Sequence, residues 1–196
     1  MKNITIGFAM TGSFCTFERA LQQMEELVRR GYEVLPVLSF NAAQLDTRFM
    51  PAQELRERVQ RITGYEPIDS LTAAEPIGPK KLCDVYVIAP VTGNSLSKLA
   101  NGQFDTPATL GAKSHLRNDK PLVLAVSTND GLGAAAQNIG RLLQWRNVYF
   151  VPFGQDDPIR KPRSLVADFE QIPRTVAAAL AGIQLQPMLT APKLMN

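Results

Sequence analysis

The fold is decided near the start of the chain, where residues 3–38 read NITIGFAMTGSFCTFERALQQMEELVRRGYEVLPVL. Residues 3–9 form a short apolar run that ends in a polar turn, which predicts a β-strand. Residues 16–30 carry apolar side chains at helical spacing, and Gly31 fits the position just after a helix. Residues 33–38 are again strand-like. Strand, helix and strand in this order predict a βαβ unit with two parallel strands.

The same alternation continues along the chain. Three further apolar runs lack a polar face, as expected for parallel strands buried on both sides, and cover residues 82–89, 122–127 and 148–152. Helices are predicted at 51–63, 94–101, 107–116 and 132–145. A polar loop is expected over 153–164, and Pro173 excludes one continuous helix over 164–181. The sequence therefore predicts an α/β fold with a doubly wound parallel sheet in three layers, one domain over 1–182 and a tail over 183–196.

Composition narrows the class of protein. The 196 residues carry a net charge of only +3, and no clustered basic face accompanies it, which argues against nucleic-acid binding. No apolar run reaches the roughly 18 residues that a membrane span needs. The two cysteines suggest no disulfide framework, so a cytoplasmic protein is expected.

Polar turns follow the first two predicted strands at their carboxyl ends, where doubly wound sheets bind ligands. The first turn is Thr11-Gly12-Ser13, whose hydroxyls and following helix N-terminus suit a phosphate. A plain N-cap with a tight turn explains the same residues. The second turn offers Ser39 and Asn41, which could bind a phosphate or a ribityl hydroxyl, or could cap the turn.

Two more polar turns follow the later strands. The turn after residue 89 contributes the largest set of candidate ligand residues, namely Pro90, Thr92, Gly93, Asn94, Ser95 and Lys98. The next strand ends in Ser127, Thr128 and Asn129. Either Asn129 or Asp130 could be the N-cap of the following helix, but capping needs only one such residue. The surplus of polar groups therefore favours a ligand.

Other reactive side chains are given structural interpretations, and no catalytic residue is assigned. Asp156 and Asp157 have no histidine or further carboxylate at useful spacing, so no metal site is predicted. Cys15 is interpreted as a small buried residue, since no base accompanies it, and Cys83 as a core residue at the start of a buried strand. His115, the only histidine, is interpreted as a partly exposed helix residue.

The segment APVTGNSLSKLANGQFD, residues 89–105, resembles the homo-oligomeric flavin-containing cysteine decarboxylase superfamily. The resemblance is carried by Pro90, Thr92, Asn94, Ser95, Lys98, Ala100, Gly102 and Asp105. It implies a Rossmann-like flavoprotein fold in which Thr11-Gly12-Ser13 takes the phosphate of FMN. It also implies a flavin lying against the turn from Pro90 to Asn94, and a homo-oligomer with intersubunit contacts at that turn.

Two departures from the superfamily argue against a decarboxylase. The decarboxylases use a histidine shortly after the second strand, whereas residues 40–82 contain none. Their "PAMN"-like turn is replaced here by Ser127-Thr128-Asn129-Asp130. These changes leave two alternatives for the site, FMN or another anion of the size of a phosphate or a substrate.

Four segments, at residues 7–18, 89–101, 127–133 and 150–169, resemble one branch of the superfamily more closely. That branch is the second subunit, or B subunit, of a two-subunit oxidoreductase of sporulating bacteria. The resemblance implies oxidation of a dihydropyridine dicarboxylate in the cytoplasm of the mother cell, with NAD(P) held by the partner, the A subunit. A noncatalytic subunit that binds FMN or an anion and shapes its partner, and an FMN-dependent decarboxylase, are the alternatives.

Overall fold

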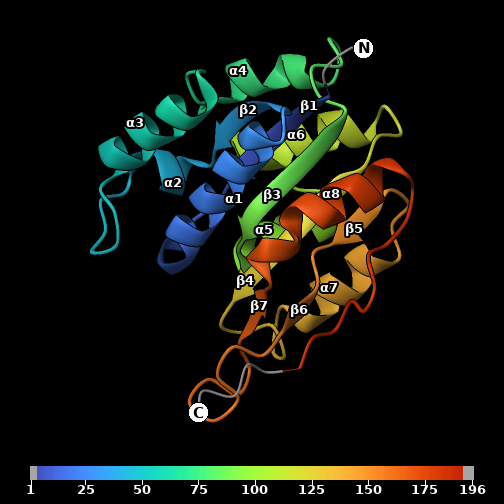
Figure 1. Cartoon of the computed structure of the whole chain (residues 1–196). Coiled ribbons are helices and arrows are strands. Elements are labelled where there is room, and N and C mark those ends of the chain that lie inside the picture. The colour runs from blue at the N-terminus through green and yellow to red at the C-terminus, as the bar shows by residue number, and fades with distance from the viewer. Residues whose placement is uncertain (1–3, 192–196) are drawn as a thin grey trace.

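A parallel sheet forms the centre of the computed structural model, which describes residues 4–191 (Figure 1). Four strands lie side by side in the order β2-β1-β3-β4, and β5 pairs with the outer edge of β4. All of these neighbours are parallel. The strands are β1 (Thr5–Met10), β2 (Glu33–Leu38), β3 (Val85–Val91), β4 (Leu122–Thr128) and β5 (Val148–Phe150). The predicted parallel α/β sheet is therefore confirmed.

Helices cover both faces of the sheet, as the three-layer prediction requires (Figure 1). One face carries α1 (Phe17–Arg29), which the short helix η1 (Phe14–Thr16) precedes, and α8 (Ile172–Leu180). The other carries α5 (Gly93–Ala100), α6 (Pro107–Leu116) and α7 (Ala136–Leu143). The long connection between β2 and β3 holds α2 (Phe40–Gln44), α3 (Ala52–Thr63), α4 (Leu71–Ala74) and η2 (Glu75–Ile77).

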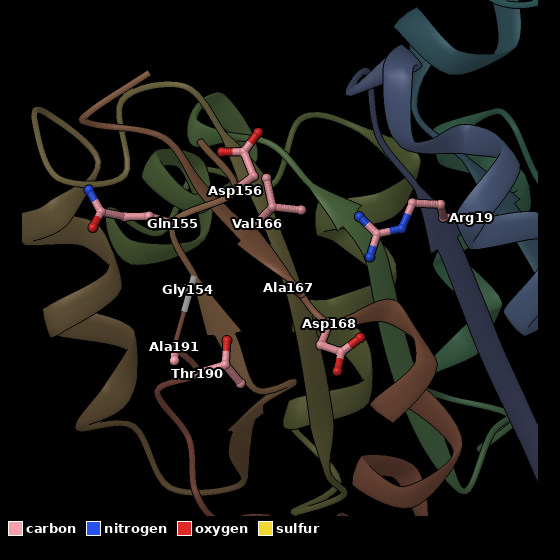
Figure 2. Close-up of a pocket in the computed structure, with 9 residues that line it drawn as sticks. All are labelled: Arg19, Gly154, Gln155, Asp156, Val166, Ala167, Asp168, Thr190 and Ala191. Carbon is pink, nitrogen blue, oxygen red and sulfur yellow. The ribbon is translucent and has the colours of Figure 1, made fainter. Parts of the chain in front are cut away.

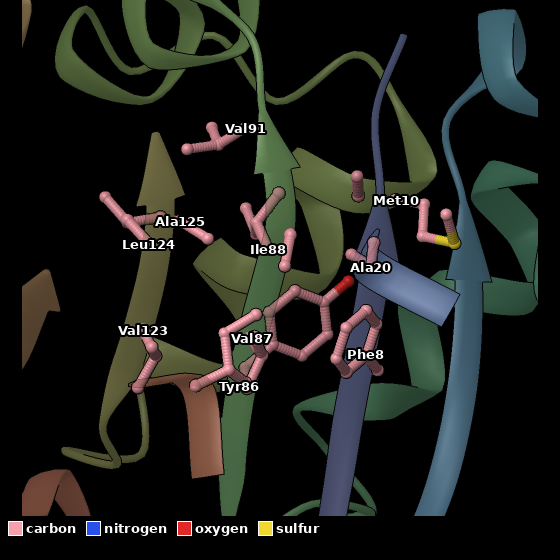
Figure 3. Close-up of a cluster of buried hydrophobic side chains, with 14 of the residues drawn as sticks. Phe8, Met10, Ala20, Tyr86, Val87, Ile88, Val91, Val123, Leu124 and Ala125 are labelled. Atoms are coloured by element: carbon pink, nitrogen blue, oxygen red, sulfur yellow. The ribbon is translucent and has the colours of Figure 1, made fainter. Parts of the chain in front are cut away.

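The core lies between these layers because the central strands are apolar on both sides. Every residue of β3 is buried, and so are the first six residues of β4. Figure 3 shows part of this cluster, with Phe8 from β1, Tyr86 and Ile88 from β3, and Leu124 from β4. Burial on both faces is the reason that the sequence shows continuous apolar runs rather than alternation.

The sheet also has an antiparallel part that the sequence did not predict. β6 (Phe153–Gly154) lies at the start of the expected loop over 153–164, and β7 (Leu165–Ala167) follows that loop directly. β7 runs antiparallel to the end of β4, pairing with Ser127 and Thr128, and β6 pairs with β7. β5 pairs only with Leu122, Val123 and Leu124 of β4, so the last part of that edge is open to a returning strand.

Several element boundaries differ from the prediction. The helix expected over 132–145 begins only at Ala136, because the Leu132 amide donates to the Arg163 carbonyl and the chain turns there. The strand expected over 82–89 runs instead from Val85 to Val91, through a cis Ala89–Pro90 bond. Pro173 lies in the first turn of α8, as predicted, after β7 and η3 (Phe169–Gln171).

The segment 183–191 is held against the sheet edge. The Gln184 side chain exchanges hydrogen bonds with the Phe150 backbone, and the Phe153 amide donates to the Met188 carbonyl. Asn3, which the sequence assigns to the first strand, and residues 192–196 of the predicted tail lie outside the described residues. Within residues 4–191 no helix is long and apolar enough to cross a membrane.

Packing between α6 and β3 generates a stability prediction. A Cβ added at Gly111 would lie 2.8 Å from Tyr86 Cζ and 3.1 Å from Ile77 Cδ1. Gly111→Ala should therefore lower the free energy of unfolding by about 1–3 kcal/mol through overpacking. Gly140→Ala in α7 is the control, since a Cβ there meets no atom within 4 Å, and it should raise stability by up to about 1 kcal/mol. Urea unfolding measures both, and a stabilising Gly111→Ala would contradict this packing.

Candidate functional site

The candidate site lies at the carboxyl edge of the sheet, where the direction of chain progression changes. The chain passes from β1 to β2 on one side of β1 and then returns to β3 on the other side. The turns after β1 and β3 therefore meet at a topological switch point, which is where open α/β sheets bind ligands.

Thr11 joins these two turns. Its hydroxyl donates to the Pro90 carbonyl at 2.9 Å and accepts from the Thr92 amide at 3.1 Å. Its own amide donates to the same carbonyl at 3.2 Å. Thr11 is only 1% exposed, so these bonds are made away from water. The hydroxyl is thus engaged within the protein, and Thr11 positions the turns on either side of it.

Hydroxyl groups continue the site toward β4. Ser13 Oγ lies 2.7 Å from Ser127 Oγ, and Thr16 Oγ1 lies 3.3 Å from the same oxygen. Ser13 is the N-cap residue of η1 and Thr16 that of α1, but neither side chain makes a capping hydrogen bond, so capping does not account for these hydroxyls. The sequence singled out Ser13 and Ser127, but not Thr16, whose position three residues after Ser13 was the available signal.

The first two turns are neighbours at Gly12. A Cβ at Gly12 would lie 3.4 Å from Asn41 Cβ and 3.4 Å from Phe14 Cζ, which is ordinary van der Waals contact. Asn41 is exposed, and its side chain makes no hydrogen bond with the residues that the structure describes. Ser39 is different, because its hydroxyl accepts from the Ala42 amide at 3.4 Å and caps α2. The capping alternative is confirmed for Ser39, while Asn41 is available to a ligand.

The third turn leads into α5. Thr92 is the N-cap, accepting from the Ser95 amide at 3.2 Å and donating to Ser95 Oγ at 3.0 Å. A Cβ at Gly93 would lie 2.8 Å from Thr128 Oγ1, so this turn also packs against the end of β4. The Asn94 side chain is exposed, and within residues 4–191 neither it nor the Gly93 and Asn94 amides have a hydrogen-bond partner. These amides and the Asn94 side chain remain free for a ligand.

The fourth turn is shaped by Asp130. Its carboxylate accepts from the Thr128 hydroxyl, and its carbonyl accepts from the Gly133 amide at 2.8 Å. The N-cap of α7 is Ala135, without a side-chain bond, so the prediction that Asn129 or Asp130 caps this helix is wrong. Asn129 is exposed at the tip of the turn.

Lys98 contributes little free charge to the site. Its ammonium forms an ion pair with Asp105 at 2.6 Å. The hydrogen bond from Lys98 holds the pKa of the Asp105 carboxyl below its usual range. The edge of the sheet therefore offers mainly neutral donors, that is, amides, hydroxyls and carboxamides.

Other singled-out residues lie away from this edge. His115 is 1% exposed rather than partly exposed, and its Nε2 lies 3.0 Å from the Pro121 carbonyl oxygen. Cys15 is exposed, which contradicts the expected buried position. Cys83 is buried as predicted, and desolvation raises the pKa of its thiol to about 12.

The acidic pair at Asp156 and Asp157 is engaged by neighbouring cations. Lys161 lies 3.4 Å from Asp156, and Arg160 lies 3.9 Å from Asp157. Among residues 4–191 no three His, Cys, Asp or Glu side chains are grouped to hold a metal ion.

This arrangement of turns on a doubly wound sheet is shared with a known class of proteins. The Flavoprotein family model matches residues 1–178, and the chain belongs to that family. The B subunit of dipicolinate synthase from Bacillus subtilis (strain 168) is 50% identical over 189 residues, covering 96% of this chain and 94% of the relative. The crystal structure of the B subunit of dipicolinate synthase from Bacillus halodurans is 47% identical with a TM-score of 0.89, covering 97% and 100% of the two chains. The FMN-dependent cysteine decarboxylase SpaF shares the fold at 20% identity and a TM-score of 0.68, covering 91% and 95%.

The bonds of Thr11 generate a prediction about the switch point. Thr11→Val keeps the shape of the side chain but leaves the Thr92 amide without its acceptor, so the free energy of unfolding should fall by about 1–3 kcal/mol. Thr11→Ser keeps the hydroxyl and loses one methyl group, which should cost about 0.8 kcal/mol. Urea unfolding compares the two. Equal stabilities would show that the hydroxyl does not support the turns.

The buried histidine generates a prediction about pH. Burial, opposed by the bond to Pro121, lowers the pKa of His115 to about 4, below the value of 6.5 in an unfolded chain. The unfolded state therefore binds the extra proton first, and stability is lost as the pH falls from 6.5 toward 4, by about 3 kcal/mol. His115→Gln cannot titrate and should lose that much less over the same range. If the unfolding free energies of the unmodified protein and of His115→Gln changed with pH in parallel, the lowered pKa of His115 would be contradicted.

Proposed function

We propose that the chain is the B subunit of a dipicolinate synthase, which works with the A subunit of that enzyme to oxidise dihydrodipicolinate to dipicolinate. The observation that carries the proposal is the intact carboxyl edge, in which the turns after β2, β3 and β4 present free amides or carboxamides beside the hydroxyls of the first turn. The relatives that bear this name span nearly the whole chain, which supports the same activity. Residues 1–182 would form the flavoprotein-like domain, in the cytoplasm of the mother cell.

The residues at this edge fit FMN. Gly12 leaves the first turn open beside Asn41, and the Gly93 and Asn94 amides have no partner within residues 4–191 at the N-terminus of an eight-residue helix. These amides are hydrogen-bond donors that acceptor atoms of a flavin ring system could use. Gly12 and Ser13 would hold the phosphate, with Asn41 beside it. The ring system would face the third and fourth turns, that is, Pro90, Thr92, Gly93, Asn94, Ser95, Thr128 and Asn129. When bound, the flavin would supply two-electron redox chemistry.

The reaction requires precise positioning of the substrate and the acceptor. Loss of a hydride and a proton from a dihydropyridine gives an aromatic ring, so the substrate itself drives the step. The protein has to align donor and acceptor and to meet the charge of the carboxylates. The edge offers amides, hydroxyls and carboxamides for alignment. The nicotinamide acceptor, NAD(P), would be bound by the A subunit.

Two other functions are weighed against this one. A noncatalytic subunit would use the flavoprotein fold to shape its partner, and the absence of a histidine from residues 40–82 favours it. The free donors at Gly93, Asn94 and Asn41 count against it, since a pure scaffold does not need them. An FMN-dependent decarboxylase is disfavoured further, because the only histidine is buried and bonded to Pro121. A homo-oligomer built around the third turn would accompany either flavin-binding function.

The test is dipicolinate formation by the two-subunit enzyme. Asn94→Ala removes a free carboxamide from the edge, and turnover should fall at least about tenfold. Asn101→Ala is the matched control, because Asn101 ends the same helix and bonds to the Ser97 carbonyl and to Arg141, away from the edge. It should turn over at the rate of the unmodified enzyme. Equal rates for the two variants, or the full rate from the partner alone, would contradict a catalytic role for this chain.

A further inference from the structure

A cavity lies beside the candidate site and is not part of it. It has a volume of about 150 Å³ and lies between α1, β6, β7 and the segment before residue 192 (Figure 2). Arg19, Asp156, Ala167, Asp168 and Thr190 are among the residues that line it. A cavity of about this volume can hold one six-membered ring.

Asp168 lines this cavity and has one carboxylate oxygen without a partner. Its Oδ1 is buried and has no hydrogen-bond partner among the described residues. Asp168 is the N-cap residue of η3, yet its side chain does not cap that helix. Its other oxygen accepts a long contact, 3.5 Å, from the Gln171 carboxamide. A buried carboxylate oxygen without a donor is costly, so a structure that keeps one calls for an explanation outside the fold.

Arg19 supplies the opposite charge. Within residues 4–191 its guanidinium forms no ion pair, and it lies 4.9 Å from the centre of the Phe169 ring. Stacking on an aromatic face fixes the plane of a guanidinium and leaves its N–H edge open. Figure 2 shows the Arg19 side chain extending from α1 toward the segment that carries Ala167 and Asp168. The open N–H edge of the Arg19 guanidinium is suited to a bidentate hydrogen bond with a carboxylate.

The cavity adjoins the hydroxyl groups of the candidate site. Arg19 follows Thr16 by one helical turn, and Thr16 Oγ1 lies 3.3 Å from Ser127 Oγ. Ser127 is also paired with Val166 of β7, which lines the cavity. A molecule bound against Arg19 and Asp168 is therefore next to the turns that are proposed to hold the flavin.

We propose that this cavity is the substrate subsite, in which Arg19 binds one carboxylate of the dihydropyridine dicarboxylate and Asp168 accepts the proton lost on aromatisation. This inference rests on the proposed function. Asp156 lines the same cavity, but it lies 3.4 Å from the Lys161 ammonium, so Asp168 is the carboxylate that is available to accept the proton.

The step balances in atoms and electrons. One C–H bond of the ring breaks with its electron pair, and the hydride passes to the two-electron acceptor, a flavin or a nicotinamide. The C–H bond on the neighbouring carbon breaks as its proton moves to the Asp168 carboxylate, and the electron pair left behind completes the aromatic ring. The carboxyl group then returns the proton to water.

The first experiment separates turnover from binding in the two-subunit enzyme. Asp168→Asn should lower kcat by about 10²- to 10⁴-fold with little change in KM, as expected for a lost general base. Asp157→Asn is the control, because Asp157 is not among the residues that line the cavity and lies 3.9 Å from Arg160, and it should keep the kcat of the unmodified enzyme. Matching circular dichroism and unfolding midpoints confirm that the variants fold. A kcat for Asp168→Asn equal to that of the control would overturn the role of Asp168.

The second experiment measures binding of pyridine-2,6-dicarboxylate to this chain alone by calorimetry. Arg19→Ala should weaken binding by about 10- to 100-fold. Arg19→Lys should weaken it by less, because lysine keeps the positive charge but cannot form the bidentate hydrogen bond of a guanidinium. Arg174→Ala, an exposed arginine of α8, is the control and should bind as the unmodified chain does. Failure of the unmodified chain to bind, or equal affinities for Arg19→Ala and Arg174→Ala, would overturn the subsite. Binding that depends on Arg19 in an enzyme whose turnover comes entirely from the partner would refute the proposed function and leave the subsite standing.

Discussion

The hydroxyl of Thr11 connects β1 and β3, the two strands between which the chain changes direction across the sheet. It donates to the Pro90 carbonyl and accepts from the Thr92 amide while almost fully buried. Thr92 in turn caps α5, so the position of this helix N-terminus depends on a bond made from the first strand. The free amides of Gly93 and Asn94 are therefore fixed before any ligand arrives, which is the preorganisation that a ligand site requires.

Neutral donors and charged side chains occupy different places near this edge of the sheet. The switch point holds neutral donors, because Lys98 is engaged by Asp105. Arg19 and Asp168 line the neighbouring cavity instead, and within residues 4–191 neither of them forms an ion pair. Neutral donors suit the positioning of a cofactor, whereas an opposed guanidinium and carboxylate suit a substrate that carries a carboxylate and loses a proton. The two places are joined through Thr16, Ser127 and β7.

The sequence was sufficient for the parallel sheet, because strands buried on both faces must be apolar throughout, as β3 is. It was also sufficient for the four turns, since polar groups at strand ends are visible as interruptions of those runs. It missed β6 and β7, which are two and three residues long and are formed by pairing with the open end of β4. It misjudged His115 and Cys15, whose exposure depends on how helices face their neighbours. It missed Arg19 and Asp168, because only tertiary packing shows that a carboxylate lacks a partner.

The most direct test of this account is the visible absorption spectrum of the purified chain before and after addition of FMN, followed by gel filtration. The account predicts flavin absorption bands that elute with the protein, at a stoichiometry close to one FMN for each chain. Complete separation of FMN from the protein would contradict it, and would mean that the donors at Asn41, Gly93 and Asn94 serve another ligand.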